Sequence, residues 1–403
     1  MSELNFLEKL LDRTEVEWKT LGDVAKKIYS GGTPDTKKTE YWEGGTVPWM
    51  SSGEVNLKTV KETEKYITEA GLNNSSAKLV PKNSVVMALA GQGKTRGKVA
   101  RTRIVLTTNQ SLAALTFDEK KINSDYIFHF LETQYESLRQ ISSGNSGRGG
   151  LNLQMISAYK VPIPCPDNPE KSLAIQSEIV RILDTFTALT AELTAELTMR
   201  KKQYNYYRDQ LLSFDDGEVE WKTLGELAEN LDSKRKPITS GLREAGKIPY
   251  YGASGIVDYV KDYIFDGDFL LVSEDGANLL ARNTPIAFSI SGKTWVNNHA
   301  HVLKFDTYAA RRYVEYYLNS IDLTTYISGA AQPKLNKKNL ESIRIPNPPS
   351  EEKERIVSIL DKFDALTNSI TEGLPREIEL RQKQYEYYRD MLFSFPKPDV
   401  VEA

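Results

Sequence analysis

Most of this chain consists of an internal sequence repeat, and this repeat constrains the fold more than any other feature. The segment EVEWKTLG occurs at 15–22 and recurs without change at 218–225. The segment RKKQYNYYRDQLLSF at 200–214 recurs as RQKQYEYYRDMLFSF at 381–395. Self-similarity of this kind is typical of structural units that share one fold.

Two further pairs of segments extend the repeat. IVRILDTFTALT at 179–190 matches IVSILDKFDALT at 356–367, and LNLQMISAYKVPIP at 151–164 matches LNKKNLESIRIPNP at 335–348 more weakly. The near-identical parts have helical patterns, whereas the parts between them diverge. We interpret the chain as a duplicated unit of one globular domain and one long helix. The alternative of two unrelated core helices is disfavoured by the near-identity of the copies.

The first helical segment carries one apolar seam. Apolar residues recur in steps of three and four from Ser172 to Ser213, which predicts a helix of roughly 40 residues and about 60 Å. In the second copy the seam starts at Ile356, but Gly373 and Pro375 should kink or break the helix. Two such helices in one chain are expected to pack antiparallel as a coiled coil.

The divergent segments are predicted to be mixed α/β domains, because short strand candidates such as SVVMAL and FLLVS alternate with turns and a helical pattern closes each segment. The N-terminal FLEKLLDRTEVEWKTLG aligns with 208–225, so the N-terminal segment should complete the distal helical region. The predicted class is α+β: two similar mixed α/β domains separated by two long antiparallel coiled-coil helices, in a circularly permuted repeat with approximate two-fold symmetry. The expected divisions are an N-terminal segment, first domain, first helical region, second domain, second helical region and tail: 1–14, 15–165, 170–215, 218–348, 350–395 and 396–403.

Composition excludes several classes of protein. The 403 residues allow two to four domains, and the 40% hydrophobic content contains no apolar run long enough to cross a membrane. The N-terminus is too acidic for a signal peptide, so we expect a cytoplasmic protein without a membrane span. One cysteine, Cys165, excludes a disulfide framework. The net charge of −3 does not exclude nucleic acid, because attraction to phosphate is set by local patches.

The stretch MALAGQGKTRGKVAR at 87–101 contains G-K-T and needs a test as a nucleotide-binding loop. Ala88 stands where the loop pattern requires its first glycine, and the residues after Thr95 have a strand pattern where a helix should begin. The aligned second copy, EDGANLLARNTP, lacks G-K-T altogether. NPPS at 347–350 resembles a methyltransferase motif, but Ser350 replaces its aromatic residue and a helix start is favoured. We therefore predict no catalytic residues.

Metal binding is also not expected. The three histidines leave few ligands, and His299 and His301 alternate along NNHAHV. A polar or base-contacting strand face is favoured there over a metal pair. The sequence therefore predicts no metal site.

Glycine-rich basic loops are the candidates for contact with DNA. Small glycines allow close approach of the backbone to phosphate, and Arg, Lys, Asn and Gln offer donors to base edges. Any one of these loops could instead be a solvated, flexible loop, but their occurrence together favours DNA. The predicted contacts of the first domain are Thr33, Lys37, Gln92, Lys94, Arg96, Lys98, Arg101, Gln110, Asn145 and Arg148. Those of the second domain are Lys234, Arg235, Lys236, Asn278, Arg282, Asn298, His299 and Lys334.

Along its full length the sequence resembles the specificity (S) subunits of type I restriction-modification enzymes. The motifs that carry the resemblance are the EVEWKTLG openings, SGGTPDT followed by WEGGTVPWMS, the loop GQGKTRGKVA, LNLQMISAYKVPIPCP, and the two helical ends QYNYYRDQLLSF and QYEYYRDMLFSF. The second domain departs from the SGGTP and GKVA patterns.

The resemblance implies two target recognition domains, each reading one half of a bipartite, asymmetric site in double-stranded DNA. It also implies helices that set the spacer between the half-sites and dock two methyltransferase (M) subunits, with two restriction/translocase (R) subunits added to the complex. S-adenosylmethionine, ATP and Mg²⁺ would then bind the partners, and this chain would need no cofactor. The expected partner contacts are Tyr204, Tyr207, Leu211, Tyr385, Tyr388 and Leu392.

Within the first helix, TAELTAEL at 190–197 repeats a four-residue unit. Each unit adds about 6 Å of helix, near the rise of two base pairs. The hypothesis is that these units act as a ruler for the spacer. The alternative function is a two-lobed coiled-coil scaffold that binds proteins and reads no DNA sequence. The basic loops of both domains disfavour this alternative.

Overall fold

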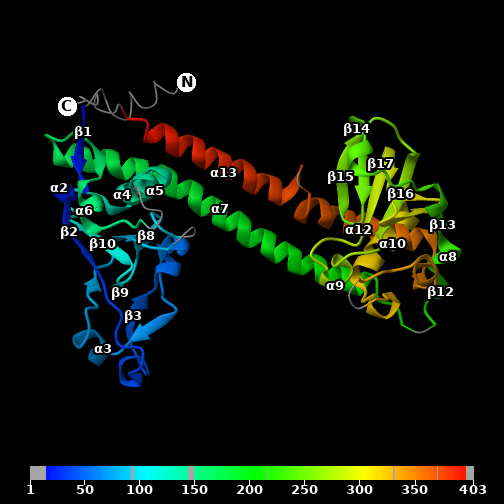
Figure 1. The fold of residues 1–403 in the computed structure, drawn as a ribbon, viewed down its shortest axis with the longest axis horizontal. Helices are drawn as coiled ribbons and strands as arrows, with labels where there is room; N and C mark the ends of the chain where they lie inside the picture. The colour runs from blue at the N-terminus through cyan, green and yellow to red at the C-terminus, as the bar shows by residue number, and fades with distance from the viewer. Residues whose placement is uncertain are drawn as a thin grey trace. The chain divides into compact units, whose positions relative to one another are not determined.

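The chain forms two units in the computed structural model (Figure 1). Unit 1 comprises 1–192 and 378–403, and unit 2 comprises 193–377. Helix α7 (Pro169–Leu211) begins in unit 1 and ends in unit 2 as one uninterrupted helix, as its apolar seam predicted. The structure describes residues 15–91, 95–143, 149–215, 217–329, 332–369 and 371–395.

The main sheet of unit 1 has five strands in the order β2-β10-β7-β8-β4. Its neighbouring strands are antiparallel except β8 and β4, which are parallel. A second sheet has the order β5-β3-β9-β6. The bounds are β2 (Ala25–Ser30), β3 (Val47–Met50), β4 (Thr59–Val60), β5 (Lys65–Ile67), β6 (Leu79–Val80), β7 (Val85–Ala88), β8 (Val99–Thr102), β9 (Leu106–Thr108) and β10 (Leu112–Phe117).

The main sheet of unit 2 has one strand more than that of unit 1, and its first four strands follow the same order. Its order is β13-β18-β16-β17-β14-β15, and the step from β17 to β14 is again parallel. The central strands β7 and β16 therefore occupy the same place, as do β8 and β17. This agrees with the predicted alignment of GQGKTRGKVA with EDGANLLARNTP. The bounds are β13 (Glu229–Asn230), β14 (Ala245–Gly252), β15 (Gly255–Val260), β16 (Phe265–Ser273), β17 (Ala287–Val296) and β18 (Ala300–Lys304).

The identical EVEWKTLG segments form identical local structures. Strand β1 (Val16–Thr20) pairs with β11 (Lys160–Pro164), and β12 (Glu220–Thr223) pairs with β19 (Arg344–Asn347). In both pairs a tryptophan lies opposite a proline, and the threonine that ends the strand forms a capping box for the helix that follows. The weakly matched segments at 151–164 and 335–348 thus have equivalent roles.

Short helices surround both sheets. Helix α4 packs on β7 and β8, and helix α10 packs on β16 and β17. The helices are α2 (Leu21–Val24), α3 (Glu69–Asn73), α4 (Ser124–Thr133), α5 (Tyr135–Ser143), α6 (Leu153–Ala158), α8 (Leu224–Leu227), α9 (Asn278–Ala281), α10 (Tyr308–Ser320), α11 (Lys337–Glu341), α12 (Ser350–Thr367) and α13 (Gly373–Leu392). The 3-10 turns are η1 (Thr39–Tyr41), η2 (Ser52–Leu57), η3 (Asp232–Lys234), η4 (Ser240–Leu242) and η5 (Thr324–Tyr326).

The second helical region is interrupted, as predicted. Helix α12 ends at Thr367 and α13 begins at Gly373, whose φ is +73°. A Cβ atom at Gly373 would lie 2.3 Å from the carbonyl oxygen of Ala365, so glycine is required there. Pro375 follows in the first turn of α13, where a missing backbone N–H costs nothing.

Each unit contains one antiparallel pair of helices. In unit 1 the first part of α7 lies beside the last part of α13, running in the opposite direction (Figure 1). In unit 2 the last part of α7 lies beside α12, where Tyr207 stacks on Phe363. In both units the apolar seams of the pair join the core beneath the sheet. The predicted position of 1–14 lies outside the described residues.

Among the described helices, none combines the length and the hydropathy needed to cross a membrane.

Candidate nucleic-acid interface

In unit 1 the structure brings two of the predicted basic loops together. The N–H of Leu151, just after the loop SSGNSGRGG, donates to the carbonyl of Leu89 at 3.0 Å. The guanidinium of Arg96 donates to the carbonyl of Gly149, which ties the β7–β8 loop to the same segment. The β7–β8 loop and the segment at 149–151 therefore lie next to each other in unit 1. Four predicted contacts on these loops lie outside the described residues: Gln92, Lys94, Asn145 and Arg148.

The third loop, SGGTPDTKK, is held against the strand end at 107–110. Thr33 and Gln110, both predicted contacts, are hydrogen-bonded to each other at 2.5 Å, and Gln110 and Lys37 are exposed. A Cβ atom at Gly31 would lie 2.0 Å from the carbonyl oxygen of Thr108. That glycine therefore serves close packing of the loop on the strand, not approach to a phosphate.

Lys98 lies in a pocket of about 250 Å³ at the base of the β7–β8 loop. Its Nζ atom is 2.7 Å from the side-chain oxygen of Asn56, and Lys58 in the same pocket pairs with Glu132 at 2.9 Å. Arg389 of α13 completes the lining. Lys58 and Arg389 were not predicted, because nothing in the sequence places them beside the loop.

Arg101 corrects the sequence prediction. Only 7% of this residue is exposed, and its guanidinium lies 2.9 Å from Asp184 and 3.5 Å from Asp125. To reach DNA it would have to break both ion pairs, although Asp125 would keep Arg103 at 2.7 Å and Asp184 would keep His129 at 2.9 Å. The structure therefore places Arg101 inside unit 1 and not on the exposed surface where its predicted contact with DNA would be made.

Arg235 in unit 2 is a second correction. Its guanidinium lies 2.6 Å from Glu274 and 3.3 Å from Asp232, and it donates to the carbonyl of Ala300. It therefore belongs to the interior. Its neighbours Lys234 and Lys236 are exposed, as a DNA contact requires.

Arg235 is part of a closed ion-pair network around His301. The ring Nδ1 of His301 is 2.6 Å from Asp232 and Nε2 is 2.7 Å from the carbonyl of Leu335, so both ring nitrogens have hydrogen-bond partners. Burial would raise the pKa of Asp232, but the hydrogen bond from His301 holds that pKa below its ordinary value. The pKa of Glu274 is likewise lowered, against the effect of burial, by Arg235 and Lys334.

Three residues of this network, Asp232, Glu274 and His301, have donor atoms close enough together to suit a metal ion. The guanidinium of Arg235 already pairs with both carboxylates, and both ring nitrogens of His301 already have partners. Nearby positive charge opposes a metal cation, so the geometry fits a salt-bridge network better than a metal centre. The predicted contact Lys334 pairs with Glu274 at 3.1 Å but remains exposed.

In the β16–β17 loop, which is equivalent to the β7–β8 loop, two predicted DNA contacts are hydrogen-bonded to the backbone. Arg282 has a φ of +53° and donates to the carbonyls of Leu318 and Ile321, so it caps the end of α10. Burial also lowers the pKa of Arg282. The side chain of Asn278 is joined twice to the backbone of Thr284. Both side chains therefore hold the loop in its conformation.

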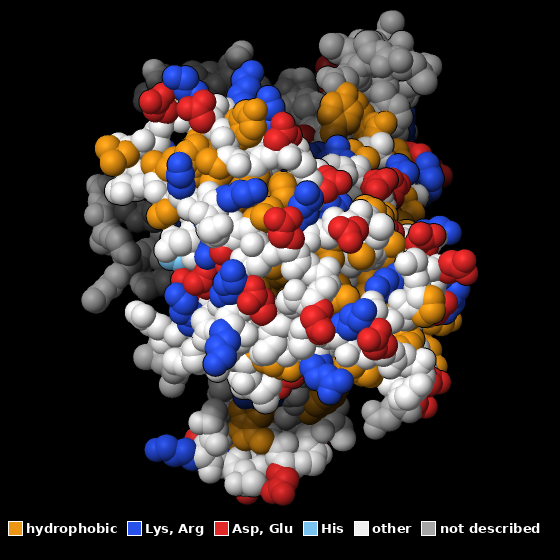
Figure 2. Space-filling view, turned by 90° about the vertical axis from the view of Figure 1, so that its right-hand side faces the viewer, with side chains coloured by type: hydrophobic (Ala, Val, Ile, Leu, Met, Phe, Trp, Pro, Cys, Tyr) orange, Lys and Arg blue, Asp and Glu red, His pale blue; other side chains and the backbone are white. Residues whose placement is uncertain are grey.

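Beside this loop, Asn298 and His299 are exposed at the turn between β17 and β18, and His299 pairs with Asp275 at 2.8 Å. These two predicted contacts stay on the candidate surface. On the face drawn in Figure 2, basic and acidic side chains are interspersed. Reading of DNA there would depend on individual loops and not on one broad positive face.

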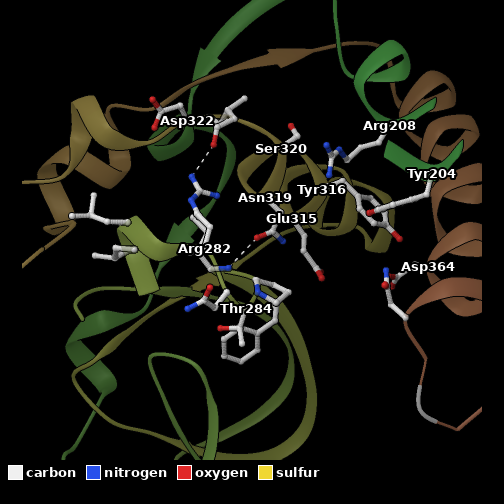
Figure 3. A pocket seen from close by; sticks show the side chains of 18 of the residues that line it. Tyr204, Arg208, Arg282, Thr284, Glu315, Tyr316, Asn319, Ser320, Asp322 and Asp364 are labelled. Carbon is white, nitrogen blue, oxygen red and sulfur yellow. Dashed lines mark hydrogen bonds between the residues drawn. The ribbon is translucent and has the colours of Figure 1, made fainter. Parts of the chain in front are cut away.

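A larger pocket of about 670 Å³ lies between the β16–β17 loop, α10 and the helix pair of unit 2. Figure 3 shows Tyr204, Tyr316 and Asp364 on one side and Arg282 on the other. Burial raises the pKa of Tyr204 to about 12, and the charge of Asp364 acts in the same direction. The pocket therefore presents neutral tyrosine hydroxyls and paired charges, and it was not foreseen from the sequence.

The predicted partner contacts differ in how far their side chains are exposed to solvent. Tyr385 and Leu392 are buried in the core of unit 1, and the partly buried Leu211 packs against the core of unit 2, so these three residues serve the packing of the units. Tyr388 stacks on Phe186, and the half-buried Tyr204 lines the pocket. Tyr207 is 45% exposed.

Two unpredicted tyrosines are more exposed. Tyr206 is 62% exposed and Tyr387 is 50% exposed. They occupy the same position in QYNYYRD and QYEYYRD, one residue off the apolar seam. The helical period alone places them away from the core, which is the signal that would have identified them.

Comparison with known proteins agrees with this architecture. The model of the type I restriction modification DNA specificity domain matches residues 14–199 and 217–380. The chain is 40% identical to the specificity subunit of the type I restriction enzyme EcoR124I/EcoR124II of Escherichia coli, over the full length of both. It is 38% identical to the EcoprrI specificity subunit of Escherichia coli, covering 92% of this chain and 93% of that one.

The fold is shared with a solved structure. The crystal structure of a type I restriction-modification S subunit from M. genitalium matches with a TM-score of 0.61 at 15% identity, covering 96% of this chain and 98% of that chain. The matched regions of the family model include both main sheets and most of the helical regions. This chain belongs to the family of DNA specificity subunits of type I restriction-modification systems.

Proposed function

We propose that each unit reads one half of a bipartite, asymmetric site in double-stranded DNA. The observation that carries this is the pair of equivalent loops, β7–β8 and β16–β17, which join equivalent strands but share almost no residues. Two copies of one fold with different side chains on the same loop are what reading two different sequences requires. A scaffold without sequence reading would have no need for this divergence.

The surface that would meet DNA is formed by the predicted residues that reach solvent. In unit 1 these include the exposed Lys37 and Gln110 and the partly exposed Lys98. In unit 2 it comprises Lys234, Lys236, Asn298, His299 and Lys334. Arg101, Arg235, Arg282 and Asn278 support these loops from inside.

The helix pairs would dock the partner subunits. Tyr206 in unit 2 and Tyr387 in unit 1 are exposed at equivalent positions, and each packs edge-on against the next tyrosine at 5.4 Å. The sequences of the two docking surfaces are nearly identical, which suits two copies of one methyltransferase subunit. Tyrosine is favoured at protein interfaces because it offers a large rigid ring and a polar end.

The chemistry would belong to the partners. The methyltransferase subunits would hold S-adenosylmethionine, and two restriction/translocase subunits would use ATP and Mg²⁺. This chain would act without a cofactor or a catalytic residue of its own, as the site that positions DNA for its partners.

The test is a map of methylated adenines in cells that express this chain with its methyltransferase partner. We expect one bipartite motif whose two halves differ and are separated by a constant number of unspecified bases. Exchanging residues 218–348 for the corresponding part of a relative should change one half only. A motif without a gap, or methylation without sequence preference, would contradict the proposal.

Binding without methylation separates the scaffold alternative. The complex should bind its own site more tightly than random DNA at the same salt concentration, since non-specific binding alone is salt-sensitive but indifferent to sequence. Equal affinity for both DNAs would favour the scaffold.

A further inference from the structure

The repeated helical segments place an aspartate at the same point in both units. Asp184 lies in ILDTF of α7, and Asp361 lies in ILDKF of α12. The flanking positions differ, since Thr185 corresponds to Lys362 and Thr187 to Asp364. What each aspartate contacts shows why it is the same in both copies.

In unit 1, Asp184 joins helix α7 to two elements of the recognition domain. Its carboxylate lies 2.9 Å from Nε2 of His129 on α4 and 2.9 Å from the guanidinium of Arg101 on β8. His129 is 1% exposed. Burial would raise the pKa of Asp184, but the bond from His129 and the charge of Arg101 keep that pKa below its ordinary value. The carboxylate is therefore charged where it joins the two elements.

In unit 2, Asp361 makes the equivalent joint with different residues. Its carboxylate accepts from the hydroxyl of Tyr316 at 2.6 Å, from Nε of Arg312 at 3.0 Å and from the hydroxyl of Tyr308 at 2.7 Å. All three donors lie on or at the start of α10. Burial is the main cause of the raised pKa of Tyr316, so its hydroxyl keeps its proton and donates.

The donors correspond as well as the acceptors. His129 follows Tyr126 by three residues in α4, and Tyr316 follows Tyr313 by three residues in α10. Tyr126 and Tyr313 are both fully buried. The recognition domains have thus diverged from histidine to tyrosine at this position while keeping a donor that faces the aspartate of the helix.

A polar joint differs from apolar packing in one respect that matters here. Apolar contact is not directional, whereas a hydrogen bond weakens steeply as its angle departs from linear. In unit 1 the carboxylate receives donors from α4 and β8, and in unit 2 it receives three donors from α10. Such a charged acceptor fixes the orientation of the domain relative to its helix. Helix α7 is continuous, so this direction bears on where the reading loops meet DNA.

We propose that Asp184 and Asp361 are positioning residues that set the angle of each recognition domain on its helix and thereby the length of spacer tolerated between half-sites. The proposal rests on the proposed function, because the spacer is its readout. A variant that loses either joint should recognise the same bases but should methylate sites with a wider range of spacer lengths.

The experiment uses the complex of the full chain with its methyltransferase partner and a series of DNAs that carry both half-sites with spacers one base shorter, native and one base longer. The variants are His129→Phe and Tyr316→Phe, each of which removes one donor to the aspartate. We expect the methylation rate on the altered spacers, relative to the native spacer, to rise by about fivefold, the lower end of typical coupling between sites.

Two further variants separate positioning from stability. His129→Tyr installs the donor of unit 2 in unit 1 and should keep the native spacer preference. Tyr126→Phe removes a different buried hydrogen bond of α4, from its hydroxyl to the carbonyl of Pro162 at 2.8 Å, and should lower stability without changing the preference. Tyr316→Phe loses a single hydroxyl, so it tests the joint even where a change at His129 prevents folding.

Equal loss of rate on all spacers in both His129→Phe and Tyr316→Phe would overturn the proposal and leave the joint a stabilising contact. A shift of preference in Tyr126→Phe as large as in His129→Phe would overturn it too. A wild-type complex that methylates without regard to the half-sites would instead refute the proposed function, which makes the two failures distinguishable.

Discussion

The ring of Phe186 stacks on the ring of Tyr388, with centroids 5.3 Å apart and planes inclined by 20°. Phe363 and Tyr207, the equivalent residues of the other unit, stack at 5.7 Å and 28°. An aromatic pair of this kind thus joins the two helices of each pair, and in unit 1 its partners come from the middle of the chain and from its C-terminal helix. Folding of unit 1 therefore requires the C-terminal helix to return to α7.

Replacing Phe186 with Leu should weaken unit 1 selectively. Leucine keeps most of the apolar surface but loses the stack, so the free energy of unfolding should fall by about 1 kcal/mol. Urea unfolding followed by tryptophan fluorescence measures the change. Phe363→Leu provides the matched variant in unit 2, and an unchanged unfolding midpoint in both would contradict the prediction.

Replacing Lys98 with Ala should weaken DNA binding with little change in stability. Loss of one phosphate contact reduces the slope of log affinity against log salt by about 1, equally for specific and random DNA. Titrations at four salt concentrations measure the slope. Lys120→Ala, an exposed lysine outside the three loops, is the control, and an equal change there would show a general charge effect.

Replacing Arg101 with Met should have the opposite outcome. The change removes the arginine from between Asp184 and Asp125 and leaves these carboxylates with only His129 and Arg103, which should cost about 3 kcal/mol of unfolding free energy. Binding of half-site DNA by the protein that remains folded should be little changed. A loss of affinity without a loss of stability would return Arg101 to the DNA surface.

Acid should destabilise unit 2 through the network around His301. The pKa values of Asp232 and Glu274 in the folded state lie below their ordinary values of 3.8 and 4.5. Their contribution to stability is therefore complete above the ordinary values and is lost as the pH falls through the lowered ones. Asp232→Asn should shrink the difference between urea midpoints at pH 7 and pH 3. Asp306→Asn, at an exposed position, should not.

Deleting one TAEL unit from α7 should shorten the preferred spacer. Both TAEL segments lie inside the uninterrupted helix α7. Removal of residues 194–197 therefore shortens that helix by about 6 Å, near the rise of two base pairs. Methylation of sites with graded spacers measures the preference. An unchanged optimum would remove the ruler hypothesis.

Local pattern was sufficient to foresee the repeat, the long helix and the interruption before α13. A helical seam, a capping threonine and a glycine at positive φ depend on neighbours a few residues away, and so they can be read in the chain itself. The equivalence of β7 with β16 was also visible, because the flanking segments kept their pattern while the loops diverged.

The roles of the basic residues depended on partners distant in the chain. Arg101 pairs with Asp184, 83 residues away, and Arg235 pairs with Glu274, 39 residues away. Arginines that indicated contact with DNA in the sequence therefore form ion pairs inside their units. Arg282 was similarly taken up by the end of α10, 39 residues away. The sequence alone established two copies of one fold with basic loops at equivalent places. Which cations face solvent followed only from packing, because an arginine beside a glycine-rich loop is equally suited to a phosphate and to a buried carboxylate.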